Sequence, residues 1–248
     1  MAHPNILLAT LGGSWQVIPE VVAVLAPSRC DLYNNHPDQS LLANVRSESS
    51  IDDLDELWII TSDSLRTTEG VTRISEWNEL LKQPLKLRVF IAAATDQVTS
   101  PFELAHLREL IFRTTLLASE SGKVVCSLAG GRKTMSADLQ RAASLFGTTG
   151  LLHVVGPEGI KFEHELGSTS PLYWTRALPA DVAARLMPAF VGRYIRRETL
   201  DIEWEGRPPV HAQRFPLLIP GNFSDKNQDI YFSQDAQSYD GFWCMALR

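Results

Sequence analysis

The chain has 248 residues, a formal net charge of −6 and three cysteines, Cys30, Cys126 and Cys244, that form no Cys-x-x-Cys pair. A chain of this length buries a core without staples, and these cysteines favour neither a zinc site nor a secreted disulfide framework. We therefore expect a cytoplasmic protein. The acidic balance argues against a protein that coats DNA through a broad positive field, but a local group of cations can still bind a small polyanion. No run of about 18 apolar residues occurs, so we expect no membrane span.

The first predicted unit is a strand, a glycine loop and a helix. An apolar run over residues 5–9 leads into Gly12 and Gly13, and apolar positions then recur at helical spacing over residues 17–25. Pro19 fits only the first turn of a helix, which predicts a helix start near residues 16–18. Residues 27–55 are polar, so we expect a long surface connection there.

The next units follow the same alternation. Apolar runs over residues 57–60 and 87–94 predict two more strands, with a helix between them. The Ser100-Pro-Phe-Glu103 string is a capping box with proline at the first helical position, and Gly122 provides the stop. A long helix is therefore expected between these two signals.

The fourth unit repeats the first, because residues 123–129 are apolar, Gly130 and Gly131 form the turn, and a helix follows. Residues 151–155 supply a fifth strand. Five buried strands that alternate with helices predict an α/β fold with a doubly wound, mainly parallel sheet. Such sheets bind ligands at the carboxyl ends of their strands, where both glycine loops fall.

The periodicity weakens after residue 156. We expect residues 1–156 to form the ligand-binding domain and residues 157–248 to form a C-terminal extension, either a lid or a dimerisation element. Within this extension, residues 161–165 and 202–204 are predicted as short strands and residues 181–198 as a helix. Tyr173 and Trp174 are expected in the core.

The two glycine loops carry the chemistry of the sequence. A glycine turn between a strand and a helix points backbone amides and the positive helix end at an anion. Arg132 and Lys133 stand beside the second loop, where an anion would offset their repulsion. The loop lacks the Gly-Lys-Ser/Thr order of a Walker motif, and Gly12-Gly13 does not fit Gly-x-Gly-x-x-Gly. An ATPase and a dinucleotide enzyme are therefore disfavoured.

Three strings together resemble the CARF family of CRISPR-associated proteins, in particular its stand-alone ring nucleases. They are Ala9-Thr-Leu-Gly-Gly-Ser14, Ile59-Ile-Thr-Ser62 and Ala129-Gly-Gly-Arg-Lys-Thr-Met135, and their order and spacing fit over residues 5–156. The resemblance implies a Rossmann-like CARF fold and a homodimer with the ligand, most often cyclic tetra-adenylate, on its two-fold axis.

The resemblance further implies a hydrolase of antiviral defence that switches off type III CRISPR signalling. Such a nuclease needs no metal or cofactor, because a ribose 2′-hydroxyl attacks the neighbouring phosphodiester and leaves 2′,3′-cyclic phosphate ends. Lys133 would stabilise the transition state, and Ser14 would position the attacking group. The implied ligand contacts are Thr10, Leu11, Gly12, Gly13, Trp15, Thr61, Ser62, Asp96, Gln97, Gly130, Gly131, Arg132, Thr134 and Met135.

Two alternatives remain open at this point. The chain could be a sensor that binds cyclic oligoadenylate without cleaving it, or a metabolic enzyme that uses the loops for a mononucleotide. Ser14 and Thr134 could also simply cap the helices that they precede.

Overall fold

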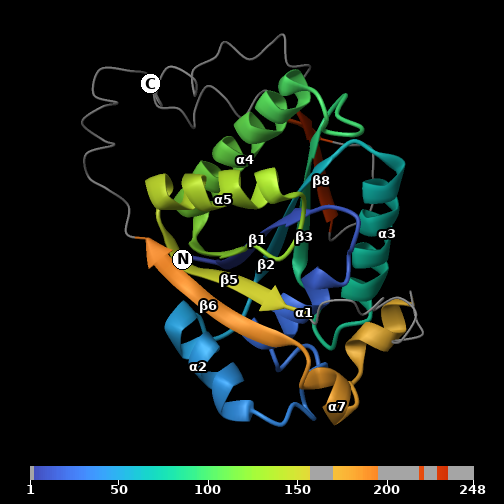
Figure 1. Cartoon of the computed structure of the whole chain (residues 1–248), viewed down its shortest axis with the longest axis vertical. Helices are drawn as coiled ribbons and strands as arrows, with labels where there is room; N and C mark the ends of the chain where they lie inside the picture. Colours follow the sequence, from blue (N-terminus) through green and yellow to red (C-terminus); the bar gives the residue numbers. More distant parts are fainter. Residues whose placement is uncertain (1–2, 157–169, 195–217, 221–227, 234–248) are drawn as a thin grey trace.

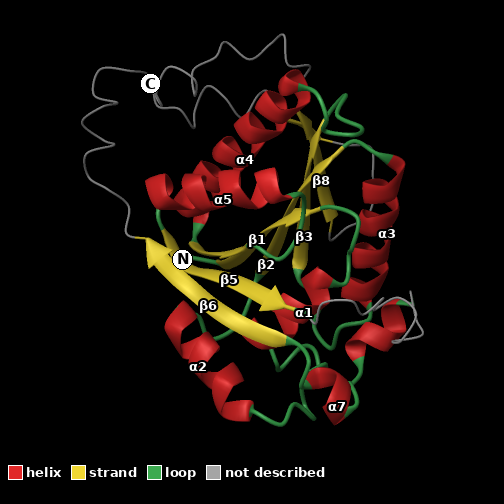
Figure 2. Ribbon diagram, in the orientation of Figure 1, coloured by secondary structure: helices red, strands yellow, loops and turns green. Residues whose placement is uncertain are grey.

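A computed structural model describes residues 3–156, 170–194, 218–220 and 228–233, and it contains an eight-stranded sheet flanked by helices (Figures 1 and 2). The order across the sheet is β6-β5-β4-β1-β2-β3-β8-β7. The strands are β1 (Asn5–Leu11), β2 (Glu56–Ser62), β3 (Lys86–Ala92), β4 (Lys123–Ser127), β5 (Thr148–Val155), β6 (Met187–Tyr194), β7 (Leu218–Pro220) and β8 (Gln228–Ser233).

The pairing confirms the predicted fold class. From β5 to β8 each neighbouring pair of strands is parallel, whereas β6 and β7 are antiparallel additions at the two edges. Because the chain runs outwards from β1 in both directions, the sheet is doubly wound, and the order reverses beside β1.

Helices cover both faces of the sheet (Figure 1). Alternate residues of β1 point to opposite cores: Leu7 packs with α1 and α3, whereas Leu8 packs with α4 and α5. Strand β1 is therefore buried on both faces, as a continuous apolar run predicts. The helices are α1 (Val17–Leu25), α2 (Gln39–Ser49), α3 (Leu65–Glu79), α4 (Pro101–Ser121), α5 (Lys133–Phe146), η1 (Pro171–Thr175) and α7 (Ala180–Ala183).

The predicted starts of α1 and α4 are confirmed. In α4 the Ser100 hydroxyl accepts from the Glu103 backbone amide at 3.1 Å, and the Glu103 carboxylate accepts from the Ser100 amide at 3.0 Å. Pro101 occupies the first turn and Gly122 follows the last one. The local capping signals therefore fixed both ends of this helix correctly.

Two expectations about secondary structure are wrong. The polar connection over residues 27–55 contains α2, which begins because the Asp38 carboxylate accepts from the Leu41 amide at 2.8 Å. The helix expected over residues 181–198 is replaced by the short α7 and by β6, which pairs with the edge of β5. The strands expected over residues 161–165 and 202–204 lie outside the described residues.

Residues 170–194 share the core of the first domain. Trp174 is 1% exposed, as expected, and packs edge-on against Trp15 with 6.1 Å between ring centroids. Its carbonyl oxygen accepts from Trp77 Nε1 at 3.2 Å and from Cys30 Sγ at 3.4 Å. This part of the extension is thus fixed to α3 and to the segments on either side of α1, while the boundary at residue 156 and the lid or dimerisation role stay predictions. Within the described ranges no helix is both long and apolar enough to cross a membrane.

Candidate ligand site

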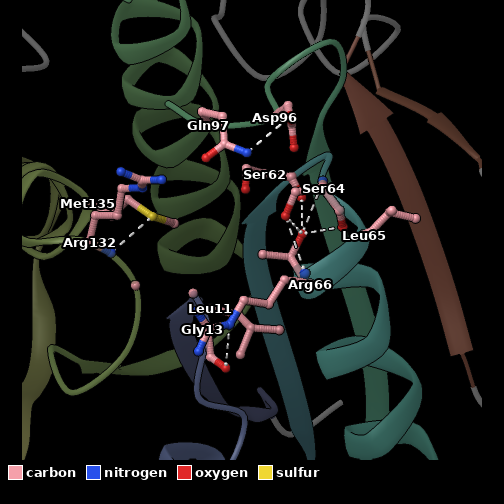
Figure 3. A pocket seen from close by; sticks show the side chains of 13 residues that line it. Leu11, Gly13, Ser62, Ser64, Leu65, Arg66, Asp96, Gln97, Arg132 and Met135 are labelled. Carbon is pink, nitrogen blue, oxygen red and sulfur yellow. Dashed lines mark hydrogen bonds between the residues drawn. The ribbon is translucent and has the colours of Figure 1, made fainter. Parts of the chain in front are cut away.

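A cavity of about 530 Å³ lies at the carboxyl ends of β1, β2 and β3, beside the first turn of α5 (Figure 3). This is the edge where the strand order reverses, and it is the expected ligand position in a doubly wound sheet. The residues that line it come from four separate segments: Leu11, Gly12, Gly13, Ser62, Ser64, Leu65, Arg66, Thr67, Asp96, Gln97, Gly131, Arg132 and Met135.

The two glycine loops touch each other beside this cavity. A Cβ added to Gly12 would lie 3.0 Å from the Gly131 Cα, so a side chain there would push the backbones apart. Gly131 also has a φ of +81°, which favours glycine. A Cβ on Gly130 would overlap the Thr10 carbonyl oxygen. The glycines are thus required by the close approach of two loops that are about 120 residues apart in the chain.

Two buried threonines hold this arrangement. The Thr10 hydroxyl, which is fully buried, donates to the Gly130 carbonyl oxygen at 2.8 Å, and Ser136 Oγ donates to the same oxygen at 3.1 Å. The Thr61 hydroxyl donates to the Leu11 carbonyl oxygen at 3.0 Å. Thr10, Thr61 and Gly130 therefore support the loops from behind and do not line the cavity.

The amino end of α5 supplies positive potential. Its N-cap is Arg132, and no side chain caps the helix, so the amides of Lys133 and Thr134 have no acceptor from within it. The Arg132 amide donates to Met135 Sδ, a weak acceptor, at 3.4 Å. In the described part of the chain, neither the Arg132 guanidinium nor the Lys133 ammonium has an ion-pair partner. This helix end can accept an anion.

The loop between β3 and α4 forms the opposite rim. Exposed Asp96 and Gln97 are joined by a 3.2 Å hydrogen bond from Gln97 Nε2 to Asp96 Oδ2. The Glu103 carboxylate accepts from the backbone amides of Asp96, Val98, Thr99 and Ser100, at 3.0 to 3.3 Å. Hydrogen bonds from Ser100 first, then from Thr99 and Val98, lower the pKa of Glu103 to about 2.

Backbone conformation in this loop is unusual. Ala94 and Val98 have φ values of 57° and 51°, a region that side chains of their kind seldom occupy. The Glu103 carboxylate holds the loop in that conformation, because it accepts hydrogen bonds from four backbone amides between residues 96 and 100. The rim is therefore held in place by hydrogen bonds within the chain.

The structure divides the predicted site residues into those that line the cavity, those exposed beside it and those buried beneath the loops. Nine predicted residues line the cavity: Leu11, Gly12, Gly13, Ser62, Asp96, Gln97, Gly131, Arg132 and Met135. Ser14, Lys133 and Thr134 are exposed on the two glycine loops but lie outside this lining. Their predicted roles in catalysis and binding stay predictions.

Trp15 does not have the position of a ligand contact. It is 6% exposed and packs against Trp174 in the core beneath the first loop. Its large apolar ring is buried by residues of the C-terminal extension, which a sequence pattern does not reveal. The prediction that Trp15 contacts the ligand is therefore not supported by the geometry.

The corner between β2 and α3 belongs to the cavity lining, although none of its residues is among the site residues predicted from the sequence. Ser64, Leu65, Arg66 and Thr67 line the cavity, and Ser64 with Thr67 forms a reciprocal capping box at the start of α3. The signal was present in the sequence as Ser-x-x-Thr directly after a buried strand. Among the described residues no group of three or more histidine, cysteine or acidic side chains is placed to hold a metal ion.

The fold and this cavity define an α/β protein with an anion-compatible ligand site at the carboxyl edge of a doubly wound sheet. Residues 49–185, more than half of the chain, match the family described as CRISPR-associated protein NE0113. The chain belongs to this CRISPR-associated family. The matched range includes β2, the β2–α3 corner, the β3–α4 loop and the second glycine loop.

Comparisons with curated proteins and with solved structures say less about this chain than the family match. No curated protein matches the chain. Among solved structures, it is similar to Enterococcus italicus Csm6 bound to cyclic hexa-2′-fluoro-hexa-dAMP, with 11% sequence identity and a TM-score of 0.37. That alignment covers 83% of this chain and 41% of the Csm6 chain, so this chain spans less than half of that structure.

Proposed function

We propose that this chain binds a cyclic oligoadenylate in the cavity between its glycine loops and cleaves it as a ring nuclease. The observation that carries the proposal is the first turn of α5, where uncapped amides and Arg132 meet the glycine backbone of the other loop. Membership of a CRISPR-associated family and the resemblance of the loop strings to CARF proteins support this ligand class.

The chemistry of the lining fits a nucleotide polyanion. Amides at a helix start and an arginine bind phosphodiester oxygens, and arginine does so with two parallel hydrogen bonds. Asp96 accepts and Gln97 both donates and accepts, so this pair can bind the polar edge of adenine or a ribose hydroxyl. The glycines let the ligand backbone come close to the loops.

The size of the cavity supports a site shared by two copies. Its volume of about 530 Å³ is in the range of roughly 300–1,000 Å³ for one drug-sized ligand. A ring of four adenylates is larger than one such molecule. We therefore propose a homodimer whose two-fold axis passes through the ring, so that each copy binds half of it.

In the proposed reaction a ribose 2′-oxygen attacks the adjacent phosphorus, and the bond from phosphorus to the 5′-oxygen of the next nucleotide breaks. The 2′-hydroxyl proton is lost to solvent and the leaving oxygen is protonated, which gives a 2′,3′-cyclic phosphate and a 5′-hydroxyl. Lys133 stabilises the charge on the phosphorane-like transition state, and Ser14 orients the attacking ribose.

The test combines binding and cleavage. Purified protein is incubated in EDTA with cyclic tri-, tetra- and hexa-adenylate, and the products are separated by chromatography. Wild type is expected to convert one ring to linear products, and Lys133→Ala is expected to bind that ring without cleaving it. Lys123→Ala is the matched control, because Lys123 is an exposed lysine at the opposite end of β4.

Three results would separate the alternatives. Binding of no ring would overturn the proposed ligand class. Binding without cleavage by wild type would identify the chain as a sensor. Tight binding of a mononucleotide in preference to every ring would favour the metabolic enzyme, for which the size of the cavity in one chain is suitable.

A further inference from the structure

The guanidinium of Arg66 lies directly on the first glycine loop. Arg66 is the second residue of α3, and its Nε donates to the Gly13 carbonyl oxygen at 3.3 Å. A Cβ added to Gly13 would come 2.5 Å from the Arg66 Cζ, so the absence of a side chain at residue 13 makes room for the guanidinium. Figure 3 shows Arg66 reaching from the corner of α3 towards Gly13 beside the cavity.

The charge of Arg66 has no partner in the described part of the chain. Five other arginines there are neutralised by a carboxylate within 3.3 Å, namely Arg29, Arg73, Arg88, Arg108 and Arg113, whereas Arg46 donates to the Val24 carbonyl oxygen. Arg66 donates only to a neutral carbonyl, and its two terminal nitrogens have no recorded acceptor. The one carboxylate in the cavity lining, Asp96, already accepts from Gln97.

Arg66 and Arg132 bring two such cations to the same cavity from different elements. Arg66 is on α3 and Arg132 is at the start of α5, and the touching glycine loops lie between those two elements. Two unpaired guanidiniums beside one cavity repel each other unless an anion lies between them or solvent screens them. A phosphodiester chain is an anion that can contact both.

Leu65 adds an apolar surface next to Arg66. Its side chain is 86% exposed although it lines the cavity, and it is the most exposed large hydrophobic residue of the described chain. Covering an exposed leucine with a flat apolar surface is favourable, because water is released from both. The face of a nucleobase is such a surface.

We propose that Leu65 and Arg66 form a further ligand-binding segment of this site, in which Arg66 binds a phosphodiester and Leu65 contacts the face of the adjacent base. Gly13 is the positioning residue that lets the guanidinium lie against the first loop. The inference rests on the proposed function, since it assigns these residues to the same cyclic oligoadenylate.

Binding of a fluorescent cyclic oligoadenylate to the full chain, measured against ionic strength, tests this segment. Arg66→Gln is expected to weaken binding about tenfold to a hundredfold, the usual effect of losing a hydrogen bond to a charged group. It should also make the affinity less sensitive to salt. Leu65→Ser should weaken binding several-fold and leave the salt dependence unchanged. Arg73→Gln, an exposed and ion-paired arginine on the same helix, is the matched control.

A double-mutant cycle isolates the role of Gly13. Gly13→Ala should weaken binding in the wild-type background and have little effect in the Arg66→Ala background, because the new Cβ displaces a guanidinium that is then absent. Equal effects in both backgrounds would overturn the positioning role. If wild type binds the ring but Arg66→Gln behaves like Arg73→Gln, the role proposed for Leu65 and Arg66 is wrong; if wild type binds no ring, the proposed function itself fails. Circular dichroism of each variant checks that the fold is kept.

Discussion

The shared carbonyl oxygen of Gly130 leads to a quantitative prediction. Thr10 and Ser136 both donate to it, at 2.8 and 3.1 Å, and they come from opposite sides of the second glycine loop. Thr10→Val keeps the shape of the side chain and removes one donor, while the carbonyl keeps the other. We expect this single change to cost about 1 kcal/mol, the usual net value of a hydrogen bond. That cost corresponds to a melting temperature lower by about 2–4 °C in a chain of this size.

Removing both donors should cost more than the sum. Ser136→Ala alone is expected to cost a similar ~1 kcal/mol, because it removes the single hydroxyl hydrogen that Ser136 shares between the Gly130 and Leu128 carbonyl oxygens, each 3.1 Å away. The double variant leaves the buried Gly130 carbonyl without either hydroxyl, and an unsatisfied buried acceptor costs about 1–3 kcal/mol. The total loss is then about 3–5 kcal/mol, and the coupling between the two changes is ~1–3 kcal/mol.

Urea unfolding followed by tryptophan fluorescence measures this coupling. The four proteins of the cycle are wild type, the two single variants and the double variant. If the slope of unfolding free energy against urea concentration is the same for all four, their unfolding midpoints report their stabilities. Pairing Thr10→Val with Ser119→Ala is the control, because the Ser119 hydroxyl donates to the Leu116 carbonyl on α4. A coupling below about 0.5 kcal/mol in the first pair would refute the reasoning that the two hydroxyls satisfy one carbonyl.

Three further changes test other parts of the structure. Glu103→Gln should destabilise the chain at pH 7. Because the pKa of Glu103 is lowered from 4.5 to about 2 in the folded chain, the difference in stability between variant and wild type should vanish as the pH falls from about 5 to 2. A difference in stability that stays constant over this range in acid unfolding would contradict this. Burial raises the pKa of Glu20 from 4.5 to about 8, so wild type should lose stability as the pH rises between those values, and Glu20→Gln should flatten that loss in melts taken from pH 4 to 9. Trp174→Ala should cost about 3–5 kcal/mol in urea unfolding, and a loss below 1 kcal/mol would mean that η1 does not share the core.

Local signals predicted much of the fold from the sequence. The buried strands were recognised because a parallel sheet covered on both faces needs continuous apolar runs, and α4 because its capping box and its stop lie next to it in the chain. The position of the cavity at this edge of the sheet agrees with the two glycine turns at the carboxyl ends of such strands. These features depend on residues a few positions apart.

Features set by distant partners were harder to predict. Strand β6 forms because residues 187–194 meet the open edge of β5, although their own pattern suggested a helix. Trp15 is buried because Trp174 covers it from the extension. The β2–α3 corner enters the site because β2 pairs beside β1, which brings Arg66 to Gly13. In each example the deciding contact joins segments that are far apart in the chain, and local sequence patterns do not indicate which distant segments meet.

The contact between Gly12 and Gly131 limits how this site can diverge. A side chain at Gly12 would press on the Gly131 backbone, and one at Gly131 would press on Thr10 and require a φ of +81°, so neither position accepts a side chain without a shift of its neighbours. Changes of ligand preference are cheaper at Leu65, Asp96 and Gln97, which line the cavity and are exposed. Relatives with different ligand preferences are therefore expected to vary at this rim and to retain the two glycines.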